Sequence, residues 1–125
     1  MRLLVIETDQ LFRDNLVHHL RQRGFFVFTG EDSQEISKIL GKEAITVALL
    51  GLGGMRREGL AVLRQIRDQS PATEVILMTT PDSIQHSIEG MRLGAFDDVL
   101  VPFDIDLLCS KIKQAKAGRK VPDAC

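Results

Sequence analysis

Five short runs of apolar residues recur along the chain, and most of them lack polar alternation. They are rich in Val, Ile, Leu and Phe, which is typical of strands buried on both faces of a parallel sheet. The predicted strands are Leu3–Ile6, Phe25–Thr29, Thr46–Leu50, Val75–Thr79 and Asp98–Val101.

Between these runs, apolar residues recur every three or four positions, as on the buried face of an α-helix. Asp9 is expected to cap the first helix and Gly24 to end it, while Asp32 or Ser33 starts the second and Gly41 stops it. Three further helices are predicted around Leu60, Leu63 and Ile66, around Ile84, Ile88 and Met91 before Gly94, and from Asp104 to Ala115.

The alternation of five strands and five helices predicts a doubly wound α/β fold. Right-handed crossovers would place helices on both faces of a five-stranded parallel sheet. The length of 125 residues fits one domain, which we place at 1–117, with 118–125 as a frayed tail or the start of a linker. We expect functional residues directly after the strands, because ligands of such sheets bind at the carboxyl ends of the strands.

Composition narrows the classes of partner. The formal net charge is −1, so no strong field favours direct binding to nucleic acid or to a membrane. No apolar run approaches the ~18 residues of a spanning helix. Cys109 and Cys125 are read as free thiols of a reducing compartment, so we expect a cytoplasmic protein.

A glycine-rich loop follows the third predicted strand, in the segment VALLGLGGMRREG at 47–59. A dinucleotide-binding loop needs G-x-G-x-x-G after a first strand, but the third position here is Arg56. A P-loop needs Gly-Lys-Ser/Thr, but Gly59 is followed by Leu60 and Ala61. Local sequence alone therefore favours a tight connection without phosphate chemistry.

Two long segments carry a family resemblance. The segment LLVIETDQLFRDNL at 3–16 and the segment EVILMTTPDSIQHSIEGMRLGAFDDVLVPFD at 74–104 resemble the receiver domains of bacterial two-component response regulators. The pairs Gly94-Ala95 and Pro102-Phe103 match the family's Gly-Ala and Pro-Phe, and the resemblance runs over 2–116. It implies a flavodoxin-like strand order of 2-1-3-4-5.

The resemblance also implies a phosphorylation site. A receiver takes a phosphoryl group from a histidine kinase onto an aspartate that ends its third strand. Two acidic residues after the first strand help to hold Mg²⁺, and a lysine contacts the phosphoryl oxygens. The matching positions are Glu7 and Thr8 with Asp9 beside them, Gly51 for the phosphoacceptor, and Val101, followed by Pro102, for the lysine.

Several of these positions lack the group that the chemistry needs. Gly51 has no side chain to phosphorylate, Thr8 supplies no carboxylate and Val101 supplies no cation. At the switch positions the chain keeps Thr79 but has Asp98 in place of the aromatic residue. The Thr79 hydroxyl either retains a switch role or is a strand-end group that the backbone satisfies.

These losses predict a degenerate receiver that is not an enzyme, has no catalytic residue and needs no cofactor. Glu7 alone is a weak candidate for a metal ligand. We expect it to act by phosphorylation-independent contact with a protein partner or a second copy, through the fourth helix, fifth strand and fifth helix, with an output domain in a longer parent. The residues assigned to that face are Ile84, Met91, Phe96, Asp98 and Leu108.

Alternative functions stay open at this stage. Weak Mg²⁺-dependent phosphoryl chemistry could survive through Glu7 or Glu58. A flavodoxin-like small-ligand site could use the loop Gly51–Gly54 with Arg56. The pair Arg56-Arg57 reads either as an anion site or, more simply, as a solvated basic turn.

Overall fold

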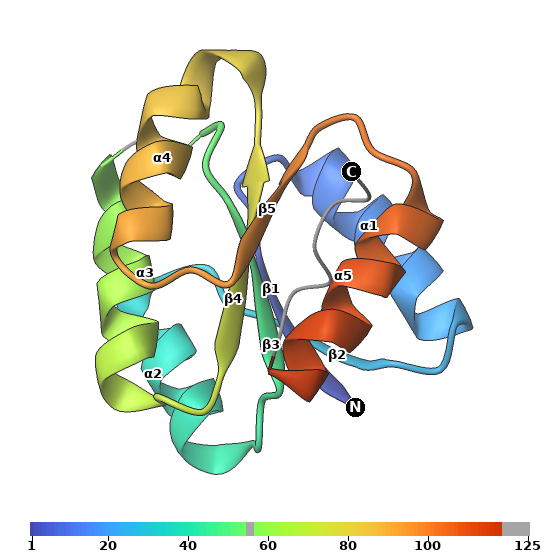
Figure 1. Ribbon diagram of the computed structural model, residues 1–125. Helices are drawn as coiled ribbons and strands as arrows, with labels where there is room; N and C mark the ends of the chain where they lie inside the picture. Colours follow the sequence, from blue (N-terminus) through green and yellow to red (C-terminus); the bar gives the residue numbers. More distant parts are fainter. Residues whose placement is uncertain (55–56, 119–125) are drawn as a thin grey trace.

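Five parallel strands form a single sheet through the middle of the molecule (Figure 1). The computed structural model describes residues 1–54 and 57–118. The sheet order β2-β1-β3-β4-β5 confirms the predicted fold class. The strands are β1 (Arg2–Ile6), β2 (Phe26–Thr29), β3 (Val47–Gly51), β4 (Glu74–Thr79) and β5 (Asp97–Leu100).

Helices cover both faces of this sheet. In Figure 1, α1 and α5 lie on one face, and α2, α3 and α4 lie on the other. The helices are α1 (Gln10–Gln22), α2 (Ser33–Lys42), α3 (Arg57–Gln69), α4 (Ile84–Arg92) and α5 (Ile105–Ala117), with a short 3₁₀ turn η1 (Pro81–Ser83) before α4.

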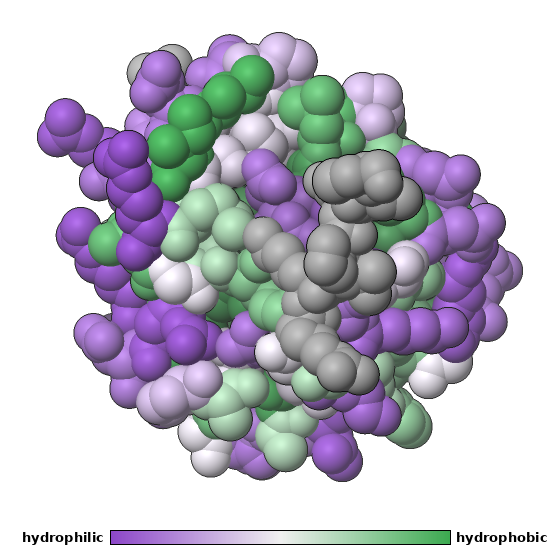
Figure 2. Space-filling view, in the orientation of Figure 1, coloured by the Kyte–Doolittle hydropathy of each residue, from purple (hydrophilic) through white to green (hydrophobic). Residues whose placement is uncertain are grey.

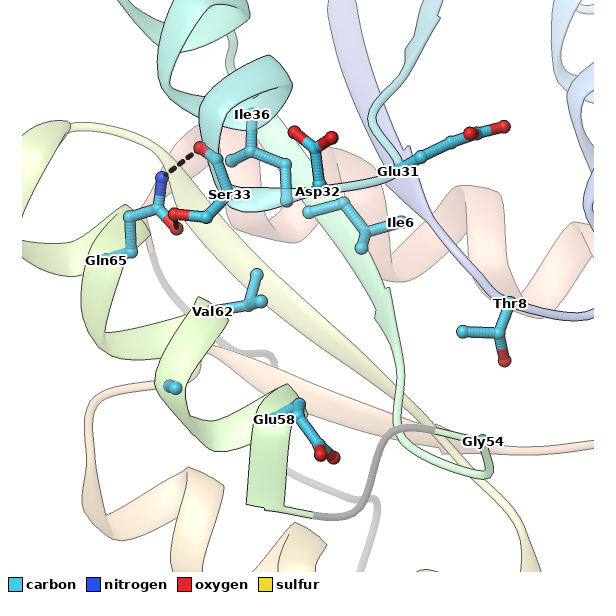
Figure 3. A pocket seen from close by; sticks show the side chains of 11 residues that line it. Ile6, Thr8, Glu31, Asp32, Ser33, Ile36, Gly54, Glu58, Val62 and Gln65 are labelled. Atoms are coloured by element: carbon cyan, nitrogen blue, oxygen red, sulfur yellow. Dashed lines mark hydrogen bonds between the residues drawn. The ribbon is translucent and has the colours of Figure 1, made fainter.

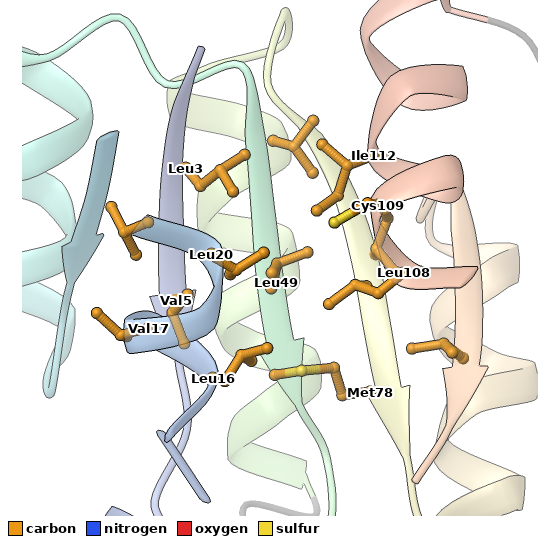
Figure 4. Packing of buried hydrophobic residues seen from close by; sticks show 14 of the residues in the cluster. Leu3, Val5, Leu16, Val17, Leu20, Leu49, Met78, Leu108, Cys109 and Ile112 are labelled. Atoms are coloured by element: carbon orange, nitrogen blue, oxygen red, sulfur yellow. The ribbon is translucent and has the colours of Figure 1, made fainter. Parts of the chain in front are cut away.

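Each face of the sheet carries its own apolar core. Alternate strand residues such as Leu3 and Leu49 pack against Leu20 of α1 and Ile112 of α5 (Figure 4). The intervening residues pack against α2 and α3 on the other face. All five residues of β3 are buried, which explains why this strand shows no polar alternation.

Three predicted helix caps are present. Asp9 Oδ1 accepts a hydrogen bond from the Phe12 N–H at 3.1 Å, and Asp32 and Asp104 cap α2 and α5 in the same way. The prediction that Gly41 stops α2 is wrong, because the helix continues to Lys42. Gly41 lacks the left-handed φ that glycine supplies at a helix end, whereas Gly24 has it, at +90°.

Candidate functional site

The ends of β1 and β3 build a crevice at the carboxyl edge of the sheet. The two strands pair with Ile6 opposite Leu50, so Glu7 and Gly51 are neighbours at this edge. The crevice has a volume of about 500 Å³. Its described lining residues are Glu7, Thr8, Asp9, Phe12, Gly53, Gly54, Met78, Thr80, Asp82 and Val101.

The carboxylate of Glu7 lies over Gly51. A Cβ atom added to Gly51 would meet Glu7 Oε2 far inside contact distance and would lie 2.7 Å from Glu7 Cδ. The other carboxylate oxygen, Oε1, accepts a hydrogen bond from the Asp9 N–H at 3.1 Å. The carboxylate at the end of β3 therefore comes from the residue after β1, and it occupies the space where a side chain on residue 51 would begin.

The next two glycines also make room for neighbouring side chains. A Cβ atom on Gly53 would lie 2.9 Å from Thr80 Cγ2, and one on Gly54 would collide with Thr8 Oγ1. Glycine at these positions lets the loop approach its neighbours closely. The run of glycines is explained by packing and needs no phosphate ligand.

The electrostatics of the crevice are acidic. Its described charged residues are Glu7, Asp9 and Asp82, and the Asp82 carboxylate accepts a short hydrogen bond from the Thr80 hydroxyl. Val101, at the predicted lysine position, packs against the core and donates its N–H to the Thr79 carbonyl at 2.7 Å. The carboxylates of this described lining disfavour the binding of a phosphoryl group through like-charge repulsion.

The same residues do not fit a magnesium site. One oxygen of Glu7 is engaged by the Asp9 N–H, Asp9 itself caps α1, and Thr8 adds only a hydroxyl. Among residues 1–54 and 57–118, no three His, Cys, Asp or Glu side chains gather so that they could hold a metal ion. Mg²⁺ prefers an octahedral set of oxygen ligands that usually includes carboxylates.

A second candidate site is a groove of about 340 Å³ between α4 and β5. It brings together the two predicted switch positions, Thr79 and Asp98. Ser87 Oγ donates a hydrogen bond to Asp98 Oδ2 at 2.9 Å. The Thr79 hydroxyl is buried and has no hydrogen-bond partner in the described part of the chain, which contradicts the alternative in which the backbone satisfies it.

Apolar side chains line the rest of the groove. Ile84, Ile88 and Leu100 are 49%, 47% and 55% exposed, and Met91 is partly buried. Figure 2 shows apolar residues gathered at the upper end of the molecular face that carries α4 and β5. The groove therefore combines an exposed apolar rim with one carboxylate and one buried hydroxyl.

Not all residues assigned to the interaction face lie on the surface. Leu108 is 0% exposed and packs in the core with Ile112, so its assignment to that face is wrong. Phe96 is partly buried against the same core. Leu100 was missed, although β5 is an edge strand whose residues alternate between buried and exposed, which places Leu100 on the same side as Asp98.

A third cavity, of about 630 Å³, lies between the start of α2 and the first half of α3 (Figure 3). Gln65 Nε2 donates a hydrogen bond to the Ser33 carbonyl at its side. Carboxylates of Glu31, Asp32 and Glu58 line it, together with Gly54. Glu31 is paired with Arg13 at 3.7 Å, and the described lining as a whole is acidic, which disfavours an anionic flavin or nucleotide there.

Some predicted residues fall outside the described part of the chain. Arg56, the proposed anion ligand, is among them, as is Cys125. Arg57 is the exposed first residue of α3. Cys109 is a buried free thiol, and burial raises its pKa, with a smaller opposing effect of Arg23.

None of the described helices is both long enough and apolar enough to cross a lipid bilayer.

Comparison with known proteins gives consistent matches. Residues 3–113 match the sequence model of a family described as "Response regulator receiver domain". The chain is 32% identical over 125 residues to the response regulator protein PmrA of Pseudomonas aeruginosa, covering 98% of this chain and 57% of PmrA. It is 28% identical over 113 residues to the transcriptional regulatory protein PhoP of Escherichia coli K12, covering 90% of this chain and 51% of PhoP.

A solved structure is similar as well. The receiver domain of NtrX from Brucella abortus has a TM-score of 0.83 and 26% sequence identity, and the match covers 92% of this chain and 98% of that chain. The chain spans about half the length of the curated relatives it matches.

Proposed function

This chain belongs to the family of response regulator receiver domains, and we propose that it signals through protein–protein contact without phosphorylation at the end of β3. The observation that carries the proposal is the position of the Glu7 carboxylate. It fills the space beside Gly51 where the family's phosphoacceptor side chain would begin. A receiver in this state has no side chain in line for attack on a phosphodonor.

The surroundings support the same conclusion. Phosphoryl transfer needs an aligned nucleophile and cations that neutralise the charge on the transferred group. Gly51 offers no nucleophile, Val101 offers no cation, and the crevice is lined by carboxylates. The oxygen atoms around Glu7 also make a poor ligand set for Mg²⁺. We therefore propose a receiver that needs no cofactor.

The face between α4 and β5 is the surface that we assign to partner binding. Ile84, Ile88 and Leu100 form an exposed apolar rim there, and contiguous exposed apolar groups often mark protein interaction sites. PmrA and PhoP are both about twice as long as the matched region, and PhoP is described as a transcriptional regulatory protein. We therefore extend the proposal to an output domain fused to this receiver in a longer cytoplasmic parent.

The test is incubation of the purified chain with a small-molecule phosphodonor and Mg²⁺, followed by intact-mass analysis. We expect no phosphoryl adduct under conditions in which a receiver that carries the aspartate is modified. A phosphoryl adduct that hydroxylamine removes, as it does from a carboxylate, would contradict the proposal. Its loss in Glu7→Gln or Glu58→Gln would show that another carboxylate has taken over the chemistry.

A further inference from the structure

We propose that the groove between α4 and β5 binds an arginine side chain of the protein partner, with the guanidinium on Asp98 and the aliphatic stem against the apolar wall. This inference rests on the proposed function, because it names the chemistry of the partner at the same face. It follows from three features of the groove: its shape, a carboxylate that has no cationic partner among the described residues, and a buried hydroxyl that has no hydrogen-bond partner among them.

The shape of the groove suits one long side chain. Its volume of about 340 Å³ is at the small end of the range for ligand pockets, which begins near 300 Å³. Ile84 and Ile88 of α4 face Leu100 of β5 across it. Methylene groups of an arginine would gain burial against these side chains while the charged end stays at a polar group.

Asp98 supplies the polar group. Its side chain is exposed and accepts a hydrogen bond from Ser87 Oγ, while a carboxylate has about four acceptor positions. No cation of the described residues pairs with Asp98. The adjacent Asp97 points to the opposite face of β5, where Lys111 Nζ holds its carboxylate at 2.8 Å. One of two successive carboxylates is thus neutralised within the chain and the other is left for an external cation.

Thr79 supplies the second acceptor. Its residue is only 3% exposed, it lines the groove, and Oγ1 has no partner among the described residues. A buried polar group without a hydrogen bond is unfavourable, and a donor from an occupant would remove that cost. A guanidinium carries five N–H donors in a planar fork, so it can meet a carboxylate and a hydroxyl together, which a compact ammonium does less well.

Other occupants fit less well. A purely apolar side chain would cover Asp98 and leave its charge desolvated and unpaired. An acidic side chain would meet the Asp98 carboxylate with like charge. Among long side chains, a positively charged one therefore complements the Asp98 carboxylate best.

The experiment is selection of random peptides on the folded chain, with Asp98→Asn as the test variant. Asp68→Asn is the matched control, because Asp68 is an exposed acid of α3 outside the groove. We expect the wild-type chain and the control to select peptides with an arginine among apolar residues. Those peptides should bind Asp98→Asn at least tenfold more weakly, and replacing their arginine with neutral citrulline should weaken binding equally.

Amide chemical shifts of Ile84, Ile88 and Leu100 locate the bound peptide, and Thr79→Val provides a second variant with a smaller expected loss. Peptides that bind this face without a preference for arginine, or equally well to Asp98→Asn, would overturn the inference and leave the proposed function standing. Selected peptides that bind elsewhere would overturn both the inference and the assignment of partner binding to this face. A dimer of the unliganded chain that buries the groove would also overturn the inference, because a second copy would then be the occupant.

Discussion

Glu7 and Gly51 form one contact in which the glycine leaves room and the carboxylate fills it. The Glu7 side chain is held in this position by the Asp9 N–H, and Asp9 is itself fixed as the cap of α1. The contact therefore depends on the local geometry of the first helix start as well as on the missing side chain. Substitutions at the two positions should not act independently.

We predict that Gly51→Ala destabilises the chain by about 1 kcal/mol, because the new Cβ expels the Glu7 carboxylate and breaks its hydrogen bond to Asp9. In a Glu7→Ala background the same substitution should cost close to nothing. A double-mutant cycle of urea unfolding measures the coupling. Additive effects of the two substitutions would show that the carboxylate does not occupy this space in solution.

For Thr79 we predict a substitution that increases the stability of the chain instead of decreasing it. Valine has a similar shape and removes the unpaired hydroxyl, so Thr79→Val should stabilise the chain by about 1 kcal/mol. Thr73→Val is the matched control, because Thr73 Oγ1 donates to the Ile45 carbonyl at 2.8 Å, and its loss should destabilise by about 1–2 kcal/mol. Thermal or urea unfolding shows whether each variant raises or lowers the free energy of unfolding. A destabilising Thr79→Val would mean that the hydroxyl has a partner.

At the scale of single residues, the sequence shows which residue stands at each position but does not predict which side chains touch. It shows that residue 51 is a glycine and that residue 7 keeps a carboxylate, but it cannot show that one lies over the other. Side-chain rotamers at the sheet edge decide that contact. The unpaired state of the Thr79 hydroxyl is similarly a property of its surroundings.

Among the elements, β5 is one of the two edge strands of the sheet, with β2 at the opposite edge. Asp97 and Val99 face α5, while Asp98 and Leu100 are exposed on the side of α4. The strand is thus joined to α5 by an ion pair and offers its other side to solvent. The ion pair between Asp97 and Lys111 therefore fixes one side of β5 to α5.

We predict that Lys111→Met destabilises the chain by roughly 2–3 kcal/mol, because it removes the ion pair that Lys111 makes with the largely buried carboxylate of Asp97. Lys113→Met changes an exposed lysine of the same helix and should have little effect. Urea unfolding compares the two. The double variant Asp97→Asn with Lys111→Met should recover part of the loss, and failure to do so would indicate that Lys111 contributes mainly through packing.

Secondary structure was predicted well where burial dominates and less well at boundaries. Apolar runs identified β1 and β3 within a residue, because both strands are buried on two faces. The position of β5 was displaced by one residue, since an edge strand that begins with two acids gives a weak apolar signal. Leu108 was misplaced even though its spacing from Ile112 and Ala115 indicates the buried face of α5.

At the scale of the whole molecule, the predicted phosphorylation pocket is assembled from the ends of β1, β3 and β5. The sheet topology brings Thr8, Gly51 and Val101 to the same edge from three distant parts of the sequence. Recognition of the family could predict this convergence. The acidic character of the resulting crevice depends on Asp82 and on the orientation of Glu7, and the sequence predicts neither.

We predict that phosphorylation can be restored only by changing all three strand ends together. Gly51→Asp alone should give no adduct with a small-molecule phosphodonor and Mg²⁺, because Thr8 supplies no carboxylate for the metal and Val101 supplies no cation for the transferred group. The triple variant with Thr8→Asp and Val101→Lys should become modified. Intact mass after equal incubation times measures both. An adduct on Gly51→Asp alone would contradict the requirement for joint change.

The contact between Glu7 and Gly51 also bears on how such a chain can evolve. Two of the four glycine codons differ from an aspartate codon by a single base, so Gly51→Asp can need only one mutation. In the folded protein the new carboxylate would meet that of Glu7, and like charges at such a distance repel. We therefore expect this single change to cost stability without supplying a phosphorylation signal that selection could favour.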